Sequence, residues 1–178
     1  MKRALALFAL GLTGLMFQGA VTSVVPVRFV PDFGLLLVFG IALSIRNPVA
    51  GVALSAVVGY ATDLLSGALM GQHVLLRMTA YGVARVGGAR LNLRGALPRA
   101  LFVFFLTLGH ALGLWLLLVF FLPAASGGLL APGTVLTQAL VNALLAPITT
   151  ELVGLLSARL GEDETGRSLR LEPRSFAR

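Results

Sequence analysis

Long apolar segments constrain this chain more than any other feature, because a helix needs about 20 apolar residues to cross the hydrocarbon core of a membrane. Such segments follow one another through most of the 178 residues, and short turns with Pro, Gly or charged side chains separate them. Hydrophobic residues make up 57% of the chain and charged residues 12%, whereas soluble domains have about 25% charged residues. The sequence therefore predicts an integral membrane protein without a separate soluble domain.

The boundaries of the apolar segments predict an all-α polytopic membrane protein with a single six-helix bundle over residues 1–160. The start of the chain has the composition of a signal peptide, but its apolar run extends to Val27, which favours a first membrane helix. The apolar run from Phe33 is short for a span, so we expect it to begin at Phe29 or to thin the bilayer. A charged tail follows at 161–178. The predicted spans are 4–25, 29–45, 49–65, 69–86, 100–122 and 134–160.

The basic residues predict the orientation of the bundle. Six spans place both termini on one side of the membrane. With the amino terminus inside, 12 of the 14 Lys and Arg residues lie at the inner face, and cytoplasmic loops favour these residues. We therefore expect both termini in the cytoplasm. The net charge of +7 then indicates orientation and contact with anionic lipids at the cytoplasmic face, and not binding of nucleic acid.

Small residues recur every four positions on the third predicted span and end at Asp63, and so they share one helix face. Small residues allow another helix to approach closely in a membrane. This face could serve packing within the bundle or docking of a helix from another protein. Our functional hypothesis uses the docking interpretation. The residues of this face are Gly51, Ser55 and Gly59, and the fifth predicted span repeats the pattern with Gly109 and Gly113.

A polar turn joins the third and fourth predicted spans. Asp63 precedes it and Arg77 follows it at a similar distance, so we expect these two side chains to form an ion pair. The pair is interpreted as a clamp of the hairpin, with partner recognition or a substrate or proton site as alternatives. His73 is expected to cap the turn, since the chain has no Cys and only two His to bind a metal. The turn itself is formed by Ser66, Gly67 and Gly71.

Three further polar positions lie within the last two predicted spans. His110 and Asn142 lie at similar depth, which predicts a hydrogen bond between them, with a small-ligand pocket as the alternative. Pro147 is expected to kink the sixth span because it lacks a backbone N–H. Glu151 is expected to pair with Arg85 or Arg99 or to be solvated, and a proton relay is the less favoured role.

Motifs of enzyme chemistry are not recognisable. The Gly87-Gly88 pair does not follow a predicted strand, and Ser66 has no base beside it. We therefore expect a protein that is not an enzyme and that has no cofactor.

Three motifs in this order resemble MreD, the small membrane subunit of the bacterial rod-shape system, or elongasome. The first is Pro31-Asp32-Phe33 at the start of a Leu-rich helix. The second is Asp63-Leu-Leu-Ser-Gly67 followed by Gly71 and His73, and the third is Ala146-Pro147 before Arg159-Leu160. The resemblance covers most of the chain from Pro31 to Leu160. Arg77, His110 and the Arg-rich tail depart from the family pattern.

The resemblance implies a non-enzymatic scaffold for peptidoglycan elongation and cell shape in the bacterial inner membrane. It implies an MreC-like single-span partner, and an assembly with RodA, a class B penicillin-binding protein and MreB. The helical arrangement of the family is similar to the substrate-binding subunit of energy-coupling-factor vitamin transporters, so a solute-binding subunit is the alternative function. A proton-coupled transporter is less favoured, because few acidic residues lie within the predicted spans.

Overall fold

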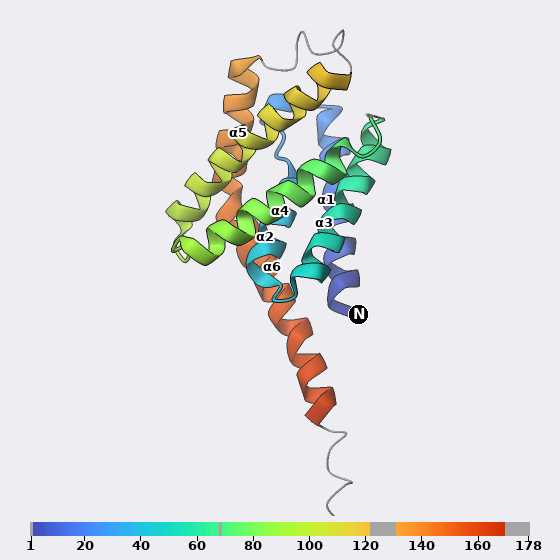
Figure 1. Cartoon of the computed structure of the whole chain (residues 1–178), viewed down its shortest axis with the longest axis vertical. Coiled ribbons are helices and arrows are strands. Elements are labelled where there is room, and N and C mark those ends of the chain that lie inside the picture. Colours follow the sequence, from blue (N-terminus) through green and yellow to red (C-terminus); the bar gives the residue numbers. More distant parts are fainter. Residues whose placement is uncertain (1, 68, 122–130, 170–178) are drawn as a thin grey trace, which may run out of the picture.

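The computed structural model describes residues 2–67, 69–121 and 131–169, the last nine of them by their helical backbone alone. Within these ranges the chain is helical and has no strand (Figure 1). This confirms the predicted all-helical fold class for the described residues. The elements are α1 (Lys2–Thr22), the 3-10 turn η1 (Val27–Phe29), α2 (Phe33–Ser44), α3 (Pro48–Ser66), α4 (Gln72–Arg90), α5 (Ala96–Phe121) and α6 (Pro132–Leu169).

The short helix α2 lies at the centre of the bundle. All of its residues from Gly34 to Ala42 are buried, and it contacts each of the other five α-helices. A helix that is apolar on every side is expected to be enclosed by other helices, and α2 has this composition. The apolar run that is short for a span is therefore the core of the bundle.

The helix boundaries differ from the predicted spans by up to four residues at most ends and by nine at the end of α6. Two of these differences have structural consequences. The second helix begins at Phe33 and not at Phe29, because η1 and the proline at position 31 precede it and Asp32 caps its amino end. The sixth helix continues to Leu169, so the first half of the predicted tail is helical. Most of the predicted Gly/Pro-rich turn at 123–133 lies outside the described residues.

Five helical segments are long and apolar enough to cross a membrane, which indicates a multi-pass membrane protein. They are Lys2–Thr22, Val27–Ser44, Pro48–Ser66, Ala96–Phe121 and Pro132–Leu160. The fourth predicted span is not among them, because α4 includes Arg77, Arg85 and Arg90 within 19 residues. Composition alone thus accounts for five spans and not for six.

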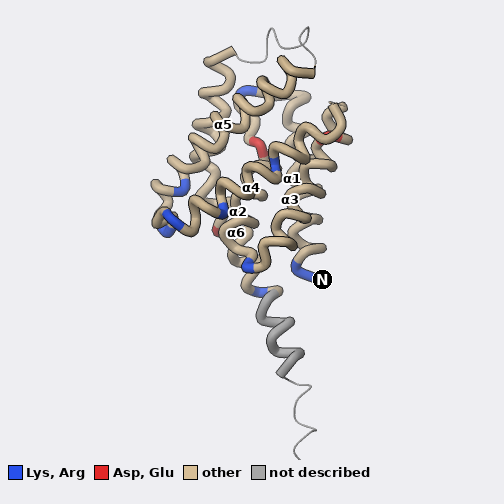
Figure 2. The backbone as a smooth tube through the Cα atoms, viewed as in Figure 1, with Lys and Arg blue, Asp and Glu red and all other residues tan. Residues whose placement is uncertain are grey.

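Basic residues gather at one end of the bundle, the end that holds the amino terminus, the α2–α3 turn and the α4–α5 loop (Figure 2). We call this the basic end. Glu151 is an acidic residue at this end. Asp32, at the start of α2, and Asp63, near the end of α3, lie toward the other end of the bundle. The basic end comprises Lys2, Arg3, Arg46, Arg85, Arg90, Arg94, Arg99 and Arg159.

Candidate functional site: a buried polar cluster and a groove between α4 and α5

Arg77 of α4 is a deeply buried charged residue, with 1% of its surface exposed, as is Asp63. Its Nη2 atom donates to Oδ1 of Asp32 at 2.6 Å. The guanidinium group lies against Gly34, where an added Cβ would be 2.9 Å from Nη2. The pair therefore depends on a residue without a side chain at position 34.

The predicted pair of Asp63 with Arg77 is wrong, because Arg77 pairs with Asp32 and Asp63 has other partners. Asp63 accepts hydrogen bonds from the backbone N–H groups of Gly71 at 2.9 Å and His73 at 3.0 Å, and its Oδ1 lies 2.8 Å from Nδ1 of His73. The first N–H groups of a helix have no partner within the helix. Asp63 therefore joins the end of α3 to the start of α4.

The turn between α3 and α4 has the predicted residues. Gly67 ends α3 with φ of +62°, and Gly71 precedes α4 with φ of +94°. These are conformations that a residue without Cβ adopts readily. The hydroxyl of Ser66 donates to the carbonyl of Asp63 at 3.4 Å. Asp63 is the residue that caps this turn, and His73, which the sequence predicted as the cap, is one of its partners.

Asn142 of α6 is buried and holds the amino end of α2. Its Oδ1 accepts from the backbone N–H of Asp32 at 2.8 Å, and its Nδ2 donates to the hydroxyl of Thr107 at 3.2 Å. The predicted bond between His110 and Asn142 is therefore wrong, since the nearer turn of α5 supplies the partner. Gln18 of α1 accepts from the N–H of Phe33 at 3.1 Å.

We define the buried polar cluster as the buried and partly buried side chains Gln18, Asp32, Asp63, Gln72, His73, Arg77, Thr107, His110 and Asn142. Its hydrogen bonds form two groups. One group joins Asp32 to Arg77 and Asn142, with Thr107 bonded to Asn142, and the other joins His73 to Asp63 and Gln72. The rings of His73 and His110 are 6.4 Å apart between centroids. Several buried polar atoms of the cluster have no hydrogen-bond partner among the described residues. They are Nε and Nη1 of Arg77, Oε1 of Gln72 and Nδ1 of His110.

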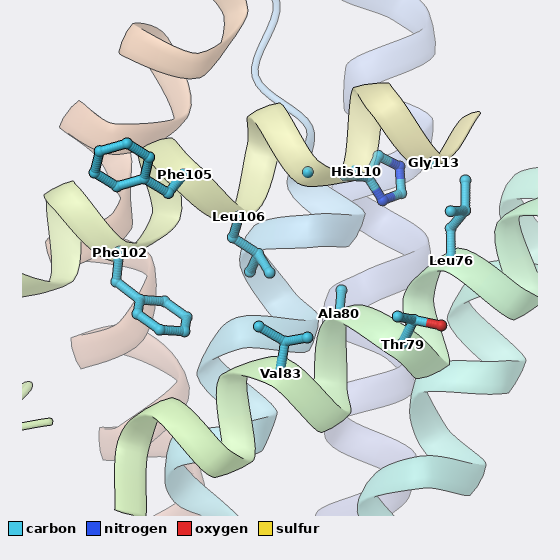
Figure 3. A pocket seen from close by; sticks show the side chains of 10 residues that line it. Leu76, Thr79, Ala80, Val83, Phe102, Phe105, Leu106, His110 and Gly113 are labelled. Atoms are coloured by element: carbon cyan, nitrogen blue, oxygen red, sulfur yellow. The ribbon is translucent and has the colours of Figure 1, made fainter. Parts of the chain in front are cut away.

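A groove lies between α4 and α5, with a volume of about 340 Å³. In Figure 3 side chains of α4 face side chains of α5 across it, and His110 lies at one end. Val83 and Phe105 are 49% and 66% exposed, so its rim is on the outer surface of the bundle. We call this the α4–α5 groove; its lining is Leu76, Thr79, Ala80, Val83, Phe102, Phe105, Leu106, Gly109, His110 and Gly113.

The two predicted small-residue faces have different surroundings. A Cβ at Gly59 would be 2.6 Å from the Cα of Val74, and one at Gly51 would collide with the ring and hydroxyl of Tyr81. The face that also includes Ser55 is thus filled by α4 of the same chain, and the hypothesis that it docks a foreign helix is wrong. A Cβ at Gly109 would have no neighbour within 4 Å, so part of the α5 face is open.

At the basic end, the structure distinguishes the two predicted partners of Glu151. Its Oε1 lies 3.8 Å from Nη1 of Arg99, and Glu151 has 71% of its side chain exposed. Arg85 instead donates to the carbonyls of Ala42 and Ile45 at the end of α2. Pro147 lies inside α6, and the hydroxyl of Thr150 donates to its carbonyl at 2.9 Å.

Sequence reasoning missed Asp32, Gln18 and Thr107 as members of the cluster, and it recognised Asn142 but gave it the wrong partner. Asp32 carried a usable signal, because an acidic residue directly before an apolar run is typical of a helix cap. Its pairing with Arg77, 45 residues later, had no such signal. Proximity along the chain favoured Asp63, and only the position of α2 inside the bundle brings Asp32 nearer.

Comparison with known proteins does not assign the chain to a family. No protein-family model matches the sequence, and neither the curated proteins nor the solved structures contain a significant match. The resemblance to MreD therefore stays a prediction from three motifs.

Proposed function

We propose that this protein is a non-enzymatic membrane scaffold that holds the transmembrane helix of a partner protein in the α4–α5 groove. The observation that carries this proposal is the open position of Gly109, in a groove whose rim lies on the outer surface. The proposal also holds that α4 crosses the membrane, which makes six spans with both termini in the cytoplasm.

A partner helix is the occupant that this groove fits. Lipid tails are as apolar as Leu or Phe side chains, so helices associate in membranes through close packing and a few hydrogen bonds. Gly109 allows close approach of a second helix backbone. His110 lies in the groove lining and is a polar side chain beside the incoming helix. A hydrogen bond between helices in a membrane contributes about 0.6 kcal/mol.

The resemblance to MreD names the class of partner. We propose an MreC-like single-span protein in the groove, within a bacterial inner-membrane assembly that includes RodA, a class B penicillin-binding protein and MreB. The groove supports only the part of this proposal that concerns a membrane helix. The identity of that helix rests on the three sequence motifs.

The test compares leucine substitutions at three glycines. Gly109→Leu fills the groove, and we expect it to reduce co-purification of a co-expressed MreC-like protein by roughly tenfold or more, since overpacking costs about 1–3 kcal/mol. Its own abundance and unfolding should stay normal, because a Cβ at position 109 meets no atom within 4 Å and the rest of the side chain extends into the groove. Gly82→Leu is the matched control, since a Cβ there also has no neighbour within 4 Å and Gly82 is not part of the groove lining.

Gly59→Leu separates docking from internal packing. Its side chain would collide with the backbone of α4, so we expect reduced abundance whether or not a partner is present. Normal partner binding by an abundant Gly109→Leu variant would contradict the docking proposal. Equal loss of binding by Gly82→Leu would show that the groove is not the specific contact.

The buried polar cluster favours a second function, which is that of a solute-binding subunit of an energy-coupling-factor-type transporter. Arg77, Gln72 and His110 hold polar atoms without described partners, and a small polar ligand could bond to such atoms. Gentle detergent extraction distinguishes the two functions. Co-purification of a pair of ATPases with a membrane coupling subunit would support the transporter, whereas an MreC-like protein would support the scaffold.

A further inference from the structure

We propose that a hollow at the α4–α5 loop binds the phosphate-bearing headgroup of an anionic phospholipid. The hollow has a volume of about 540 Å³ and lies between the end of α4, the loop and the end of α2. Its lining includes Leu43, Arg90, Asn92, Arg94 and Arg99. The site is separate from the α4–α5 groove, so its test does not depend on the scaffold function.

Three arginines of the basic end form hydrogen bonds within the protein. The arginines without such bonds are the ones whose side chains can bind a ligand. Arg3 donates to the carbonyl of Ser44 at 2.7 Å. Arg85 donates to two carbonyls at the end of α2. Arg99 donates through Nε to the carbonyl of Leu93 at 2.8 Å, and its Nη1 lies 3.3 Å from the hydroxyl of Thr150. These three side chains hold helix ends and loop in place.

Arg90 and Arg94 differ from that group. Both are exposed, both line the hollow, and neither side chain bonds to another residue in the part of the chain that the structure describes. Two cations beside one hollow repel each other, and an anion between them removes that repulsion. Asn92 has an amide group in the same lining that can donate to a phosphate oxygen.

A phospholipid fits this position better than a free anion does. Leu91 is part of the lining and is 54% exposed. Leu97 and Leu101, on the first two turns of α5 after the loop, are 70% and 52% exposed. Acyl chains would cover these side chains while the headgroup meets the arginines. Basic pockets between helix ends at the cytoplasmic side of membrane proteins bind anionic headgroups in this way.

The test measures lipid binding to the purified full-length chain by native mass spectrometry. Palmitoyl-oleoyl phosphatidylglycerol and phosphatidylcholine have the same acyl chains, so the ratio of their affinities isolates the headgroup. We expect the native chain to prefer phosphatidylglycerol. Arg90→Gln with Arg94→Gln should reduce that preference roughly 30-fold, since each arginine near an anionic headgroup contributes about 1 kcal/mol.

Arg46→Gln with Arg159→Gln is the charge-matched control, because it removes two cations of the basic end that do not line the hollow. This variant should keep the preference. Equal loss in the control would overturn the proposal and leave only a general attraction of positive charge. The proposal also fails if the native chain shows no preference, or if millimolar inorganic phosphate displaces the lipid, which would assign the hollow to a free anion.

Discussion

Arg77 places a guanidinium group in the interior of the bundle, where an unpaired charge is unfavourable and a paired one is usually functional or structural. Asp32 neutralises it and at the same time caps α2 by accepting from the N–H of Leu35 at 3.0 Å. One carboxylate therefore holds the end of the central helix and the middle of α4 together. A substitution at Asp32 can remove the charge of the side chain and still keep an oxygen that caps α2.

Asp32→Asn removes the charge but keeps an oxygen that can cap α2. We expect this variant to lose about 3–5 kcal/mol of unfolding free energy, because Arg77 remains charged and buried without its partner. Asp32→Asn combined with Arg77→Leu should be more stable than Asp32→Asn alone, since no uncompensated charge is left. Unfolding in SDS followed by circular dichroism measures these differences.

The control for this cycle is Asp63→Asn combined with Arg77→Leu. Asp63 and Arg77 have no hydrogen bond or ion pair with each other, so their effects should add within about 0.5 kcal/mol. Additive effects of the Asp32 and Arg77 substitutions would show that the observed pair has no energetic coupling. Strong coupling of Asp63 to Arg77 would instead restore the pair expected from the sequence.

At the scale of elements, α3 and α4 form a hairpin whose two helices pack closely along their length. Gly51 and Gly59 let the two backbones approach, and Asp63 caps α4 from the end of α3. The α4 and α5 helices pack much less closely against each other, and the groove lies between them. The α4–α5 groove therefore lies beside a closely packed α3–α4 hairpin, which is the arrangement that our docking proposal uses.

The pair Gly59→Ala and Gly82→Ala tests the close approach with a single methyl group. At Gly59 the methyl would meet the backbone of His73 and Val74 at 2.6 to 2.8 Å, so we expect a loss of about 1–3 kcal/mol from overpacking. At Gly82 the methyl meets nothing within 4 Å, and alanine is the better helix former, so we expect a gain of about 0.5–1 kcal/mol. SDS unfolding of both variants should give opposite signs.

At the scale of the whole molecule, the path of α4 determines the number of spans. Its composition differs from that of the five apolar segments, yet it contacts α2, α3 and α5. Two polar side chains of α4, Gln72 and Arg77, are enclosed by protein. A helix can cross a membrane with such residues when its neighbours supply their partners.

Cysteine labelling in intact cells tests whether α4 crosses, and the chain has no native Cys. Arg28→Cys in η1 should react with an impermeant thiol reagent added outside, whereas Arg94→Cys in the α4–α5 loop should react only after the membrane is permeabilised. If α4 does not cross, the loop lies on the same side as the α3–α4 turn. Labelling of Arg94→Cys in intact cells would therefore contradict the six-span topology.

The sequence by itself determined the helical class, the membrane character and the residues of the α3–α4 turn. These features depend on local composition, since about 20 apolar residues indicate a span and glycine favours positive φ. It also determined that the small-residue face on α3 packs against some helix. Tertiary structure alone decided which helix that is, because a periodic pattern shows a face and not its neighbour.

The same reason explains the errors at the polar cluster. Depth along a helix can be estimated from the sequence at 1.5 Å per residue, but the rotation of each helix and its neighbours cannot. Asp63, His110 and Arg77 were therefore assigned to the wrong partners, although each was recognised as a polar group in need of one. The placement of α2 at the centre, with Asp32 at its end facing Arg77 of α4, depends on packing among all six α-helices.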